Sequence, residues 1–451
     1  MKDLRIAVAG MGRSGLAIAR AARAHGAVPV VYDEQSADTP ERLDLVDQLQ
    51  GEGIDCVCGW HGRFDAGEHD ILVASPGFRR AHPAIVDAQR LGMEVISEIE
   101  FAYRIAKGPI LAITGTNGKS TSTVMTWLVL RALGHDPILC GNISGSGYTE
   151  LTLTEAALAG SAGQPLVAEI SSFQLEWVSQ FRPRVATITN ITPDHLDRHP
   201  TFKDYFATKM RLFDAMGEGD TMVIRSDEPS LPMSVFGNDK AARLLYGPGH
   251  EISFDADGLT IKGHRVAAST LPFDEPYNLA NAAMALAIAE AYAPGSDVPT
   301  AVRGLQEFSR LTYRMQPLGE RDGVLVINNS MCTNPMAVVN SSRGLNRPQI
   351  LLIGGVTKNL DFHPVGEYVR ESGHRAILFG PNPDPLRAMI GGDLPWFESM
   401  TEAFRFAVTS ASAGDAIVLA PGCASAYPYA NFRERGDAFT EVAKEWLEHR
   451  D

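Results

Sequence analysis

The chain has 451 residues, of which 45% are hydrophobic and 21% charged, with 42 glycines and 27 prolines. At roughly 150 residues per domain, this length predicts about three domains, and the composition excludes disordered, collagen-like and disulfide-rich proteins. The formal net charge of −14 speaks against a general nucleic-acid binder or a polybasic membrane binder. Any anionic ligand must therefore be attracted by local positive groups.

Cysteine usage and the lack of long apolar runs indicate a reduced, cytoplasmic, globular protein. The chain has five cysteines, an odd number, and Cys56 and Cys58 are too close for an ordinary bridge. No apolar stretch approaches the ~20 residues that a membrane span needs. The chain enters a strand-like run at residues 4–9 without a charged leader. Together with the negative net charge, this leads us to expect neither a nucleic acid nor a membrane as partner.

Short apolar runs alternate with amphipathic helical segments, which is typical of α/β folding around parallel sheets. In the first unit the expected strands are 4–9, 28–32, 71–75 and 94–97, with helices such as 15–25 and 83–91. The second unit has expected strands at 110–113, 166–170 and 185–189 and closes with an alanine-rich helix at 278–292. The third has strands at 324–328, 350–353, 376–379 and 416–420. We therefore expect three α/β domains.

A first glycine loop joins the first expected strand to the first helix. Residues 10–15 read Gly-Met-Gly-Arg-Ser-Gly, and Asp33 ends the next strand. Glycines let backbone amides approach a diphosphate at a helix N-terminus, and the acid accepts a ribose hydroxyl. The pattern fits NAD(P), another nucleotide diphosphate or a structural turn, and the later domains must decide among them.

A second glycine loop carries a more specific signal. The strand at 110–113 runs into residues 114–121, Thr-Gly-Thr-Asn-Gly-Lys-Ser-Thr, followed by a helix-like run. Ile113 stands where a full Walker A pattern needs glycine, so the loop is a shorter relative of that motif. Its amides cradle phosphate oxygens, Lys119 neutralises β/γ charge, and Ser120 offers a hydroxyl to Mg²⁺.

Two polar segments follow expected strands of the same unit. Residues 166–172 place Glu169 at a strand end, where a phosphate-binding loop needs an acidic metal ligand. Residues 189–199 follow the next strand and include His195. Mg²⁺ prefers oxygen to imidazole nitrogen, so His195 is either a packed or a functional histidine on chemistry alone.

Three segments together resemble the Mur ligases: 115–120, 169–175 (Glu-Ile-Ser-Ser-Phe-Gln-Leu) and 190–199. The resemblance covers essentially the whole chain in the same order. It implies an α/β protein with a Rossmann-like UDP-sugar-binding domain, a central P-loop ATPase domain and a Rossmann-like C-terminal amino-acid-binding domain. We expect their boundaries at 1–97, 98–310 and 311–451.

The resemblance assigns ATP to positions in the central and third units. The implied phosphate-binding residues are Gly115, Thr116, Asn117, Gly118, Lys119, Ser120 and Thr121. Asn278 and Asn281 match the asparagines that meet adenine, and Arg314 matches the arginine that reaches phosphate from the third domain. Unaided, Asn278 reads as a helix cap and Asn281 as a helix-face amide.

The resemblance also implies two Mg²⁺ ions and a modified lysine, with Lys119, Glu169, His195 and Lys209 as the catalytic group. Ser120 and Glu169 would hold the first ion, and His195 and Lys209 the second. Lys209, at the end of 205–209, matches the lysine that this family carbamylates, so it would carry CO₂ as a carbamate. Unaided, Lys209 reads as an exposed helical lysine.

For the other two substrates, the resemblance reassigns the first glycine loop to uridine diphosphate. The implied UDP-sugar contacts are Ser14, Asp33, Ser75, Gly77, Asn142, Ser171 and Gln174, with His195 beside the muramoyl-alanyl part. The implied amino-acid contacts are Thr333, Lys358, Ser425 and Phe432.

Two positions depart from the family pattern in one segment. The family usually reads Asn-Asp-Ser-Lys-Ala-Thr-Asn, and residues 328–334 read Asn-Asn-Ser-Met-Cys-Thr-Asn. Asn329 replaces an acid associated with ATP, and its amide can still bind a ribose hydroxyl. Met331 replaces a lysine near the amino-acid substrate, a loss of about 1.5–3 kcal/mol for a charge-assisted contact. Either Lys358 suffices, or the amino acid differs in side chain or chirality.

The implied activity is an ATP-dependent amide ligase of peptidoglycan precursor synthesis. It would add D-glutamate to UDP-N-acetylmuramoyl-L-alanine through an acyl phosphate, as a monomer acting on small molecules. The main alternative is a sister ligase that adds L-glutamate or another amino acid to a UDP-muramoyl acceptor. Three other classes of protein are alternatives. A folate polyglutamate-type ligase lacks an N-terminal UDP domain, and a dehydrogenase would explain neither the second loop nor Glu169. A non-enzymatic nucleotide-binding regulator would explain Asn329 and Met331.

Overall fold

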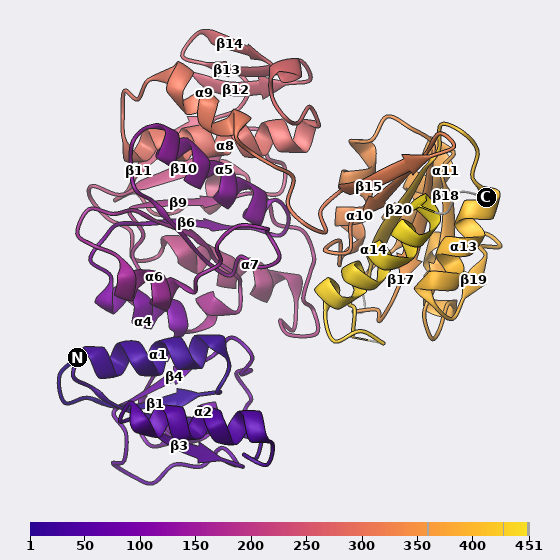
Figure 1. Cartoon of the computed structure of the whole chain (residues 1–451). Coiled ribbons are helices and arrows are strands. Elements are labelled where there is room, and N and C mark those ends of the chain that lie inside the picture. The colour runs from indigo at the N-terminus through magenta and orange to yellow at the C-terminus, as the bar shows by residue number, and fades with distance from the viewer. Residues whose placement is uncertain (359, 427, 449–451) are drawn as a thin grey trace.

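The computed structural model describes residues 1–358, 360–426 and 428–448. Figure 1 shows three lobes in chain order, each around its own sheet, with the N-terminal lobe below the central lobe and the C-terminal lobe beside it. The strands of the larger sheets are almost all parallel and are flanked by helices. The expected α/β class is confirmed.

The N-terminal lobe is a five-stranded parallel sheet in the order β3-β2-β1-β4-β5. Its strands are β1 (Arg5–Ala9), β2 (Val28–Asp33), β3 (Asp55–Cys58), β4 (Ile71–Ala74) and β5 (Glu94–Ser97). Its helices are α1 (Arg13–Ala24), α2 (Pro40–Gly51) and α3 (Pro83–Arg90). Because the strand order reverses between β1 and β4, the loops after these two strands diverge and leave a crevice for a ligand.

The central lobe is a six-stranded parallel sheet in the order β11-β10-β9-β6-β8-β7. Its strands are β6 (Ile110–Thr114), β7 (Ile138–Gly141), β8 (Leu166–Glu169), β9 (Val185–Ile188), β10 (Thr221–Arg225) and β11 (Ala242–Tyr246). A small antiparallel sheet follows, with β12 (Ile252–Asp255), β13 (Gly258–Ile261) and β14 (His264–Ala267). Strand β6 is central, and the chain places later strands on both sides of it, so the order of the strands reverses there. The second glycine loop therefore emerges at an edge of the sheet where ligands bind.

Helices cover both faces of the central sheet (Figure 1). The lobe contains α4 (Glu98–Ile105), α5 (Lys119–Ala132), α6 (Leu153–Ala159), α7 (Phe202–Met210), α8 (Pro276–Tyr292) and α9 (Val298–Gln306). Short 3₁₀ turns are η1 (Gln174–Trp177), η2 (Arg211–Phe213), η3 (Met233–Val235) and η4 (Ala268–Thr270). One apolar cluster packs β6 and β8 against α4 and continues to β1 and α1, so the N-terminal and central lobes share core contacts.

The C-terminal lobe has a six-stranded sheet in the order β15-β16-β20-β17-β18-β19, antiparallel only at β15. Its strands are β15 (Gln316–Arg321), β16 (Val324–Asn328), β17 (Gln349–Gly354), β18 (Arg375–Phe379), β19 (Trp396–Phe397) and β20 (Ala416–Gly422). Its helices are α10 (Pro335–Arg343), α11 (His363–Ser372), α12 (Asp384–Ile390), α13 (Met400–Ser410) and α14 (Phe432–Glu448). Separate apolar clusters pack α10 to α12 on one face and α13 with α14 on the other.

Every strand expected from the apolar runs is present, with bounds within a few residues of those expected, and α8 matches the alanine-rich helix. The chain pattern did not reveal the parallel strands β3, β7, β10, β11 and β19, the β12–β14 sheet, the antiparallel strand β15 or helices such as α2. All five cysteines are free thiols. Within the described part of the chain, no helix combines the length and apolar character needed to cross a bilayer.

Gly15 offers a direct test of the packing between the first glycine loop and α1. A side chain at this position would overlap the carbonyl oxygen of Gly10, whereas one at Gly12 would meet open space. We expect Gly15→Ala to lower the free energy of unfolding by about 2 kcal/mol, because overpacking against backbone cannot relax cheaply. Gly12→Ala is the matched control, with an expected cost below about 1 kcal/mol. Equal thermal unfolding of both variants would contradict this packing.

Candidate active site

The second glycine loop lies at the carboxyl end of β6 and leads into α5. Gly115 and Gly118 have φ angles of 140° and 85°, in the region that favours glycine. A side chain at Gly118 would come within 2.7 Å of Asn281 Oδ1. The Asn117 amide donates to Asn190 Oδ1 at 3.1 Å, which fixes the loop against the segment after β9. The loop thus presents the N-terminus of a 14-residue helix, where anions are stabilised.

A buried carboxylate lies beside this helix end. Glu169 is 2% exposed. Its Oε2 accepts a hydrogen bond from Ser120 Oγ at 2.5 Å and its Oε1 one from Asn142 Nδ2 at 3.1 Å. Arg314 Nη2, from the connection to the C-terminal lobe, donates to Ser120 Oγ at 2.8 Å. The structure therefore brings together the carboxylate, hydroxyl and cation that the sequence assigned to metal and phosphate.

Two lysines bind carbonyls of the same loop. Lys119 Nζ donates to the Thr116 carbonyl at 2.9 Å, and Lys209 Nζ donates to the Gly115 carbonyl at 2.7 Å. Lys209 is only 2% exposed, and its Nζ lies 4.9 Å from the Tyr205 ring centre. Burial lowers the pKa of Lys209 well below its usual value, and the charge of Lys119 lowers it further. The exposed lysine expected from the helical pattern alone is in fact buried in the site.

His195 and Asp194 lie opposite the glycine loop. His195 has a left-handed backbone with φ of 54°, and its ring centre is 4.8 Å from that of Phe173. Partial burial lowers the pKa of His195 to about 4, although Asp194 acts to raise it. The imidazole is therefore neutral near pH 7, the form that can donate a lone pair to a metal.

The C-terminal lobe reaches this site through two polar side chains. Lys358 Nζ donates to Asp194 Oδ1 at 3.0 Å, and Asn334 Nδ2 donates to Asp194 Oδ2 and to Asn117 Oδ1, each at 3.2 Å. Asp194 is 5% exposed, so these contacts are shielded from water. The lobes are thus held together at the glycine loop itself.

The candidate adenine residues lie behind the loop. Ser122 Oγ donates to Asn281 Oδ1 at 3.1 Å, Asn281 Nδ2 donates to Asn278 Oδ1 at 3.4 Å, and Asn278 Nδ2 donates to Glu275 Oε2 at 3.0 Å. Thr121 belongs to the first turn of α5. Asn329 is held within the C-terminal lobe, where it accepts from the Met315 amide at 3.2 Å. Asn278 and Asn281 are near the loop, whereas the Asn329 side chain binds the Met315 amide and Ser341 Oγ of the third part of the chain.

The candidate UDP residues line the two loops that diverge in the N-terminal lobe. Asp33 Oδ2 accepts from the Met11 amide at 2.6 Å, and Asp33 Oδ1 accepts from Arg42 Nη2 at 2.7 Å. Ser75 Oγ donates to the Ala9 carbonyl at 2.6 Å. Ser14 lies in the first turn of α1 and Gly77 follows β4. The two loops are therefore adjacent, as a diphosphate site requires.

The remaining candidate sugar residues belong to the central lobe. Gln174 Oε1 accepts from the Ser171 amide at 2.9 Å and from Ser171 Oγ at 3.0 Å. Gln174 Nε2 donates to the buried Glu98 at 3.2 Å. Asn142 already contacts Glu169, so the sugar and phosphate candidates share one network.

The candidate amino-acid residues lie on separate segments of the C-terminal lobe. Phe432 begins α14, and its ring meets that of Tyr313 edge-on at 6.0 Å. Ser425 is 9% exposed and follows β20. Thr333 lies between β16 and α10, and Lys358 follows β17.

Sequence reasoning missed a buried ion pair of the central lobe whose arginine also binds the N-terminal lobe. Arg198 Nε and Nη2 donate to the two oxygens of Glu176, each at 2.9 Å. The same guanidinium donates to the carbonyls of Pro76, Gly77 and Phe78. Arg198 therefore holds the 76–78 loop of the N-terminal lobe against the central lobe. The motif at 190–199 displayed this arginine, but nothing in the chain pattern placed Glu176 beside it.

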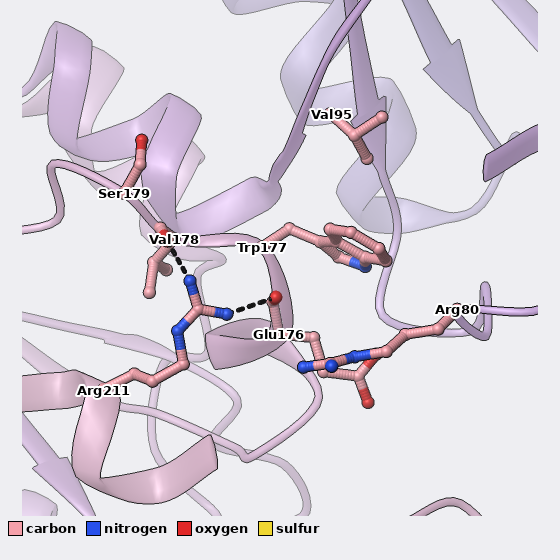
Figure 2. A pocket seen from close by; sticks show the side chains of 7 residues that line it. All are labelled: Arg80, Val95, Glu176, Trp177, Val178, Ser179 and Arg211. Carbon is pink, nitrogen blue, oxygen red and sulfur yellow. Dashed lines mark hydrogen bonds between the residues drawn. The ribbon is translucent and has the colours of Figure 1, made fainter. Parts of the chain in front are cut away.

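A cavity of about 230 Å³ lies at this junction between the N-terminal and central lobes. Figure 2 shows Arg80 and Val95 facing Glu176 to Ser179 across it, with Arg211 hydrogen-bonded to the carbonyls of Glu176 and Val178. None of the predicted site residues lines it.

Protein-family comparison matches three parts of the chain. Residues 4–97 match the MurD-like N-terminal domain of Mur ligases, residues 113–289 match the Mur ligase middle domain, and residues 313–423 match the Mur ligase glutamate ligase domain. These ranges correspond to the three lobes.

Full-length relatives share this arrangement. The chain is 32% identical to the UDP-N-acetylmuramoylalanine–D-glutamate ligase of Pelotomaculum thermopropionicum, over 97% of both chains. It is 33% identical to the ligase of the same name from Geobacillus kaustophilus, over 96% of both.

Solved structures with the same fold are more distant in sequence. The UDP-N-acetylmuramate-alanine ligase of Thermotoga maritima superposes with a TM-score of 0.60 at 18% identity, covering 98% of this chain and 100% of its own. The MurF ligase of Thermotoga maritima, in complex with ADP, superposes with a TM-score of 0.59 at 15% identity, covering 99% and 96%.

The Arg198–Glu176 pair predicts a large stability effect. Both side chains are buried, at 6% and 3% exposure. We expect Arg198→Gln to lower the free energy of unfolding by about 3–5 kcal/mol, because it leaves Glu176 buried without a partner. The control is Arg79→Gln, which breaks an exposed pair with Asp197 across the same junction and should cost less than about 1 kcal/mol. Urea unfolding of both variants checks this, and a similar small loss in both would contradict it.

Proposed function

The chain belongs to the Mur ligase family, and we propose that it is the ATP-dependent ligase that adds D-glutamate to UDP-N-acetylmuramoyl-L-alanine in peptidoglycan precursor synthesis. The observation that carries this proposal is the meeting of the central and C-terminal lobes at one glycine loop, with the N-terminal lobe bound through Arg198 to the neighbouring 190–199 segment. Lys119 and Ser120 come from the central lobe, and Asn334 and Lys358 reach it from the C-terminal lobe. One chain thus contains a candidate phosphate site, a candidate diphosphate crevice and a third domain for the incoming amino acid.

The reaction proceeds in two steps. The alanyl carboxylate attacks the γ-phosphorus of ATP, ADP leaves, and an acyl phosphate forms. The amine of glutamate then attacks the acyl carbon, loses a proton, and the tetrahedral intermediate collapses to the amide and inorganic phosphate.

The residues of the chain position these reactants and offset their charge. The amides of the glycine loop and the helix end face the phosphates, and the Lys119 ammonium lies where it offsets β/γ charge. Arg314 adds a cation at Ser120 from the interlobe connection. In this proposal the neutral His195 acts as a metal ligand and not as a general base.

ATP and Mg²⁺ are used by this family, and the residues present fit both. Glu169 and Ser120 are hard oxygen donors that would hold a first Mg²⁺. The described residues contain no group of three His, Cys, Asp or Glu side chains arranged for a metal. The ion would supply charge screening between the anionic reactants.

We further propose that Lys209 is carbamylated and that, with His195, it holds a second Mg²⁺. A neutral amine attacks CO₂, an N–C bond forms and one proton leaves, giving a carbamate. The buried position of Lys209 beside Lys119 favours the neutral amine. Once the carbamate has formed, the neighbouring Lys119 cation stabilises its negative charge.

The finer assignments belong to the same proposal. UDP-sugar contacts are Ser14, Asp33, Ser75, Gly77, Asn142, Ser171 and Gln174, and amino-acid contacts are Thr333, Lys358, Ser425 and Phe432. The adenosine contacts are Asn278, Asn281 and Asn329. The domains span 1–97, 98–310 and 311–451. The enzyme acts in the cytoplasm, in keeping with its five free thiols, and as a monomer, since one chain supplies every candidate residue.

A second candidate is a sister ligase that adds another amino acid. It is favoured by Met331 and by Lys358, whose ammonium is already paired with Asp194. Phosphate release from ATP with UDP-N-acetylmuramoyl-L-alanine and a panel of D- and L-amino acids separates the two. D-Glutamate should give the highest rate, and stimulation by no amino acid would refute both candidates.

Lys119 provides the test of the phosphate site. Its Nζ contacts the Thr116 carbonyl of its own loop, so Lys119→Ala should fold while losing the cation that faces phosphate. We expect turnover to fall by about 10²–10³-fold or more. The control is Lys107→Ala, which removes an exposed lysine before β6 and should leave turnover unchanged. Turnover of Lys119→Ala near the unaltered rate would count against the assignment.

The carbamate has its own signature. The protein equilibrated with ¹³C-bicarbonate should show a carbamate carbon resonance that is absent from Lys209→Arg, because the arginine stays protonated. The signal should fade as the pH is lowered, since protonated amine does not react with CO₂. A spectrum without this resonance, or one retained in Lys209→Arg, would remove carbamylation from the account.

A further inference from the structure

At the proposed amino-acid site of the C-terminal lobe, one expected lysine is replaced by methionine and another lysine is already in an ion pair. Met331 is neutral where the family usually has lysine. Lys358 forms a shielded ion pair with Asp194, with side chains 11% and 6% exposed. A dicarboxylate amino acid therefore meets less positive charge from these two positions than two unpaired lysines would supply.

Arg435 is a buried guanidinium in the same lobe. It lies on the first turns of α14 and is 1% exposed. Its Nη2 donates to the Ser330 carbonyl at 2.8 Å, its Nε to Ser330 Oγ at 3.1 Å, and its Nη1 to the Cys423 carbonyl at 3.2 Å. The planar fork thus joins two segments that are about ninety residues apart.

Four segments converge on this side chain, and each carries one proposed amino-acid contact. Ser330 precedes Thr333 by three positions, and Cys423 precedes Ser425 by two. A side chain at Gly355, three positions before Lys358, would come within 3.2 Å of Arg435 Nη1. Phe432 lies three positions earlier on α14, and its carbonyl accepts from Ser330 Oγ at 2.8 Å.

The charge of Arg435 has no carboxylate partner among the described residues. Its three bonds all go to neutral oxygens. Among nearby acids on α14, Glu434 accepts from the Ala430 amide and Asp437 from the Tyr313 hydroxyl. A buried unpaired cation costs free energy unless an anion compensates it.

The field of this cation extends to the loops of the site. Arg435 and Lys358 both act to lower the pKa values of Cys332 and Cys423, although burial raises each to about 12. These thiols flank the segments of Thr333 and Ser425. Two cations therefore act on the same small region.

We propose that Arg435 is the positioning residue that aligns the four amino-acid-binding segments, and that its unpaired charge selects an acidic side chain in place of the missing lysine at 331. This inference rests on the proposed ligase function. It assigns Arg435 to specificity for a dicarboxylate, and it leaves ATP and the UDP-sugar acceptor to the other lobes.

The test compares Michaelis constants for the three substrates in Arg435→Gln and Arg435→Lys. For Arg435→Gln we expect KM for D-glutamate to rise about tenfold or more, with KM for ATP and acceptor within about twofold. Arg435→Lys keeps the charge and loses the fork, so its KM should lie between. Adding Met331→Lys to Arg435→Gln should recover part of the loss. The matched control is Arg370→Gln, another arginine of this lobe that binds a carbonyl, that of Ile390.

The outcomes are separable. Wild-type protein without D-glutamate-dependent phosphate release refutes the proposed function, whatever the variants do. Wild-type protein that uses D-glutamine as well as D-glutamate, or variants that alter all three KM values equally, overturn the inference alone. If thermal unfolding shows that Arg435→Gln does not fold, Arg435→Lys decides: an unchanged KM for D-glutamate contradicts the positioning role.

Discussion

Two buried lysines against one glycine loop are the constraint on which the rest of the site depends. Lys119 and Lys209 bind carbonyls of the loop from Thr114 to Gly118, and Glu169 and Asp194 are the carboxylates whose charges favour the protonated lysines. Such a cluster is costly while it faces no anion. A protein of net charge −14 can still attract anionic reactants, because the positive potential of Lys119, Arg314 and the N-terminus of α5 is local and buried.

The lobes are attached through the same site. Arg314, Asn334 and Lys358 tie the C-terminal lobe to Ser120, Asn117 and Asp194. On the other side, Arg198 ties the N-terminal lobe to Glu176. Each attachment lies next to a residue proposed to contact a substrate, so movement of a lobe changes the site directly. A three-substrate reaction of this kind needs such coupling, because the acyl phosphate must meet the amine before water does.

Much of the fold follows from local patterns. Buried parallel strands such as β6 and β17 read as continuous apolar runs, and glycine loops mark the strand ends where ligands bind. The pattern failed where strands are short and half-exposed, as in β3, or belong to a small antiparallel sheet, as in β12 to β14. Lys209 shows the limit for single residues: its helix looks amphipathic, and only the packing of α7 against β6 buries it.

The site divides in the same way. The phosphate-binding loop and Glu169 were predictable because their chemistry depends on contiguous residues. The partners of Arg198 and Arg435 were not, since these guanidinium groups bind segments from 12 to 122 residues away. Arg435 could not be predicted for a further reason. A buried arginine without a carboxylate partner is rare, and the sequence of its helix gives no sign that Arg435 lacks one.

The central claim is that the acceptor carboxylate is phosphorylated at this glycine loop before the amide forms. Acceptor labelled with ¹⁸O in both oxygens of the alanyl carboxylate tests it most directly, with D-glutamate and unlabelled ATP. An acyl phosphate requires that one labelled oxygen leave with the inorganic phosphate, while the other stays in the amide. Phosphate that carries no ¹⁸O after turnover would contradict the account.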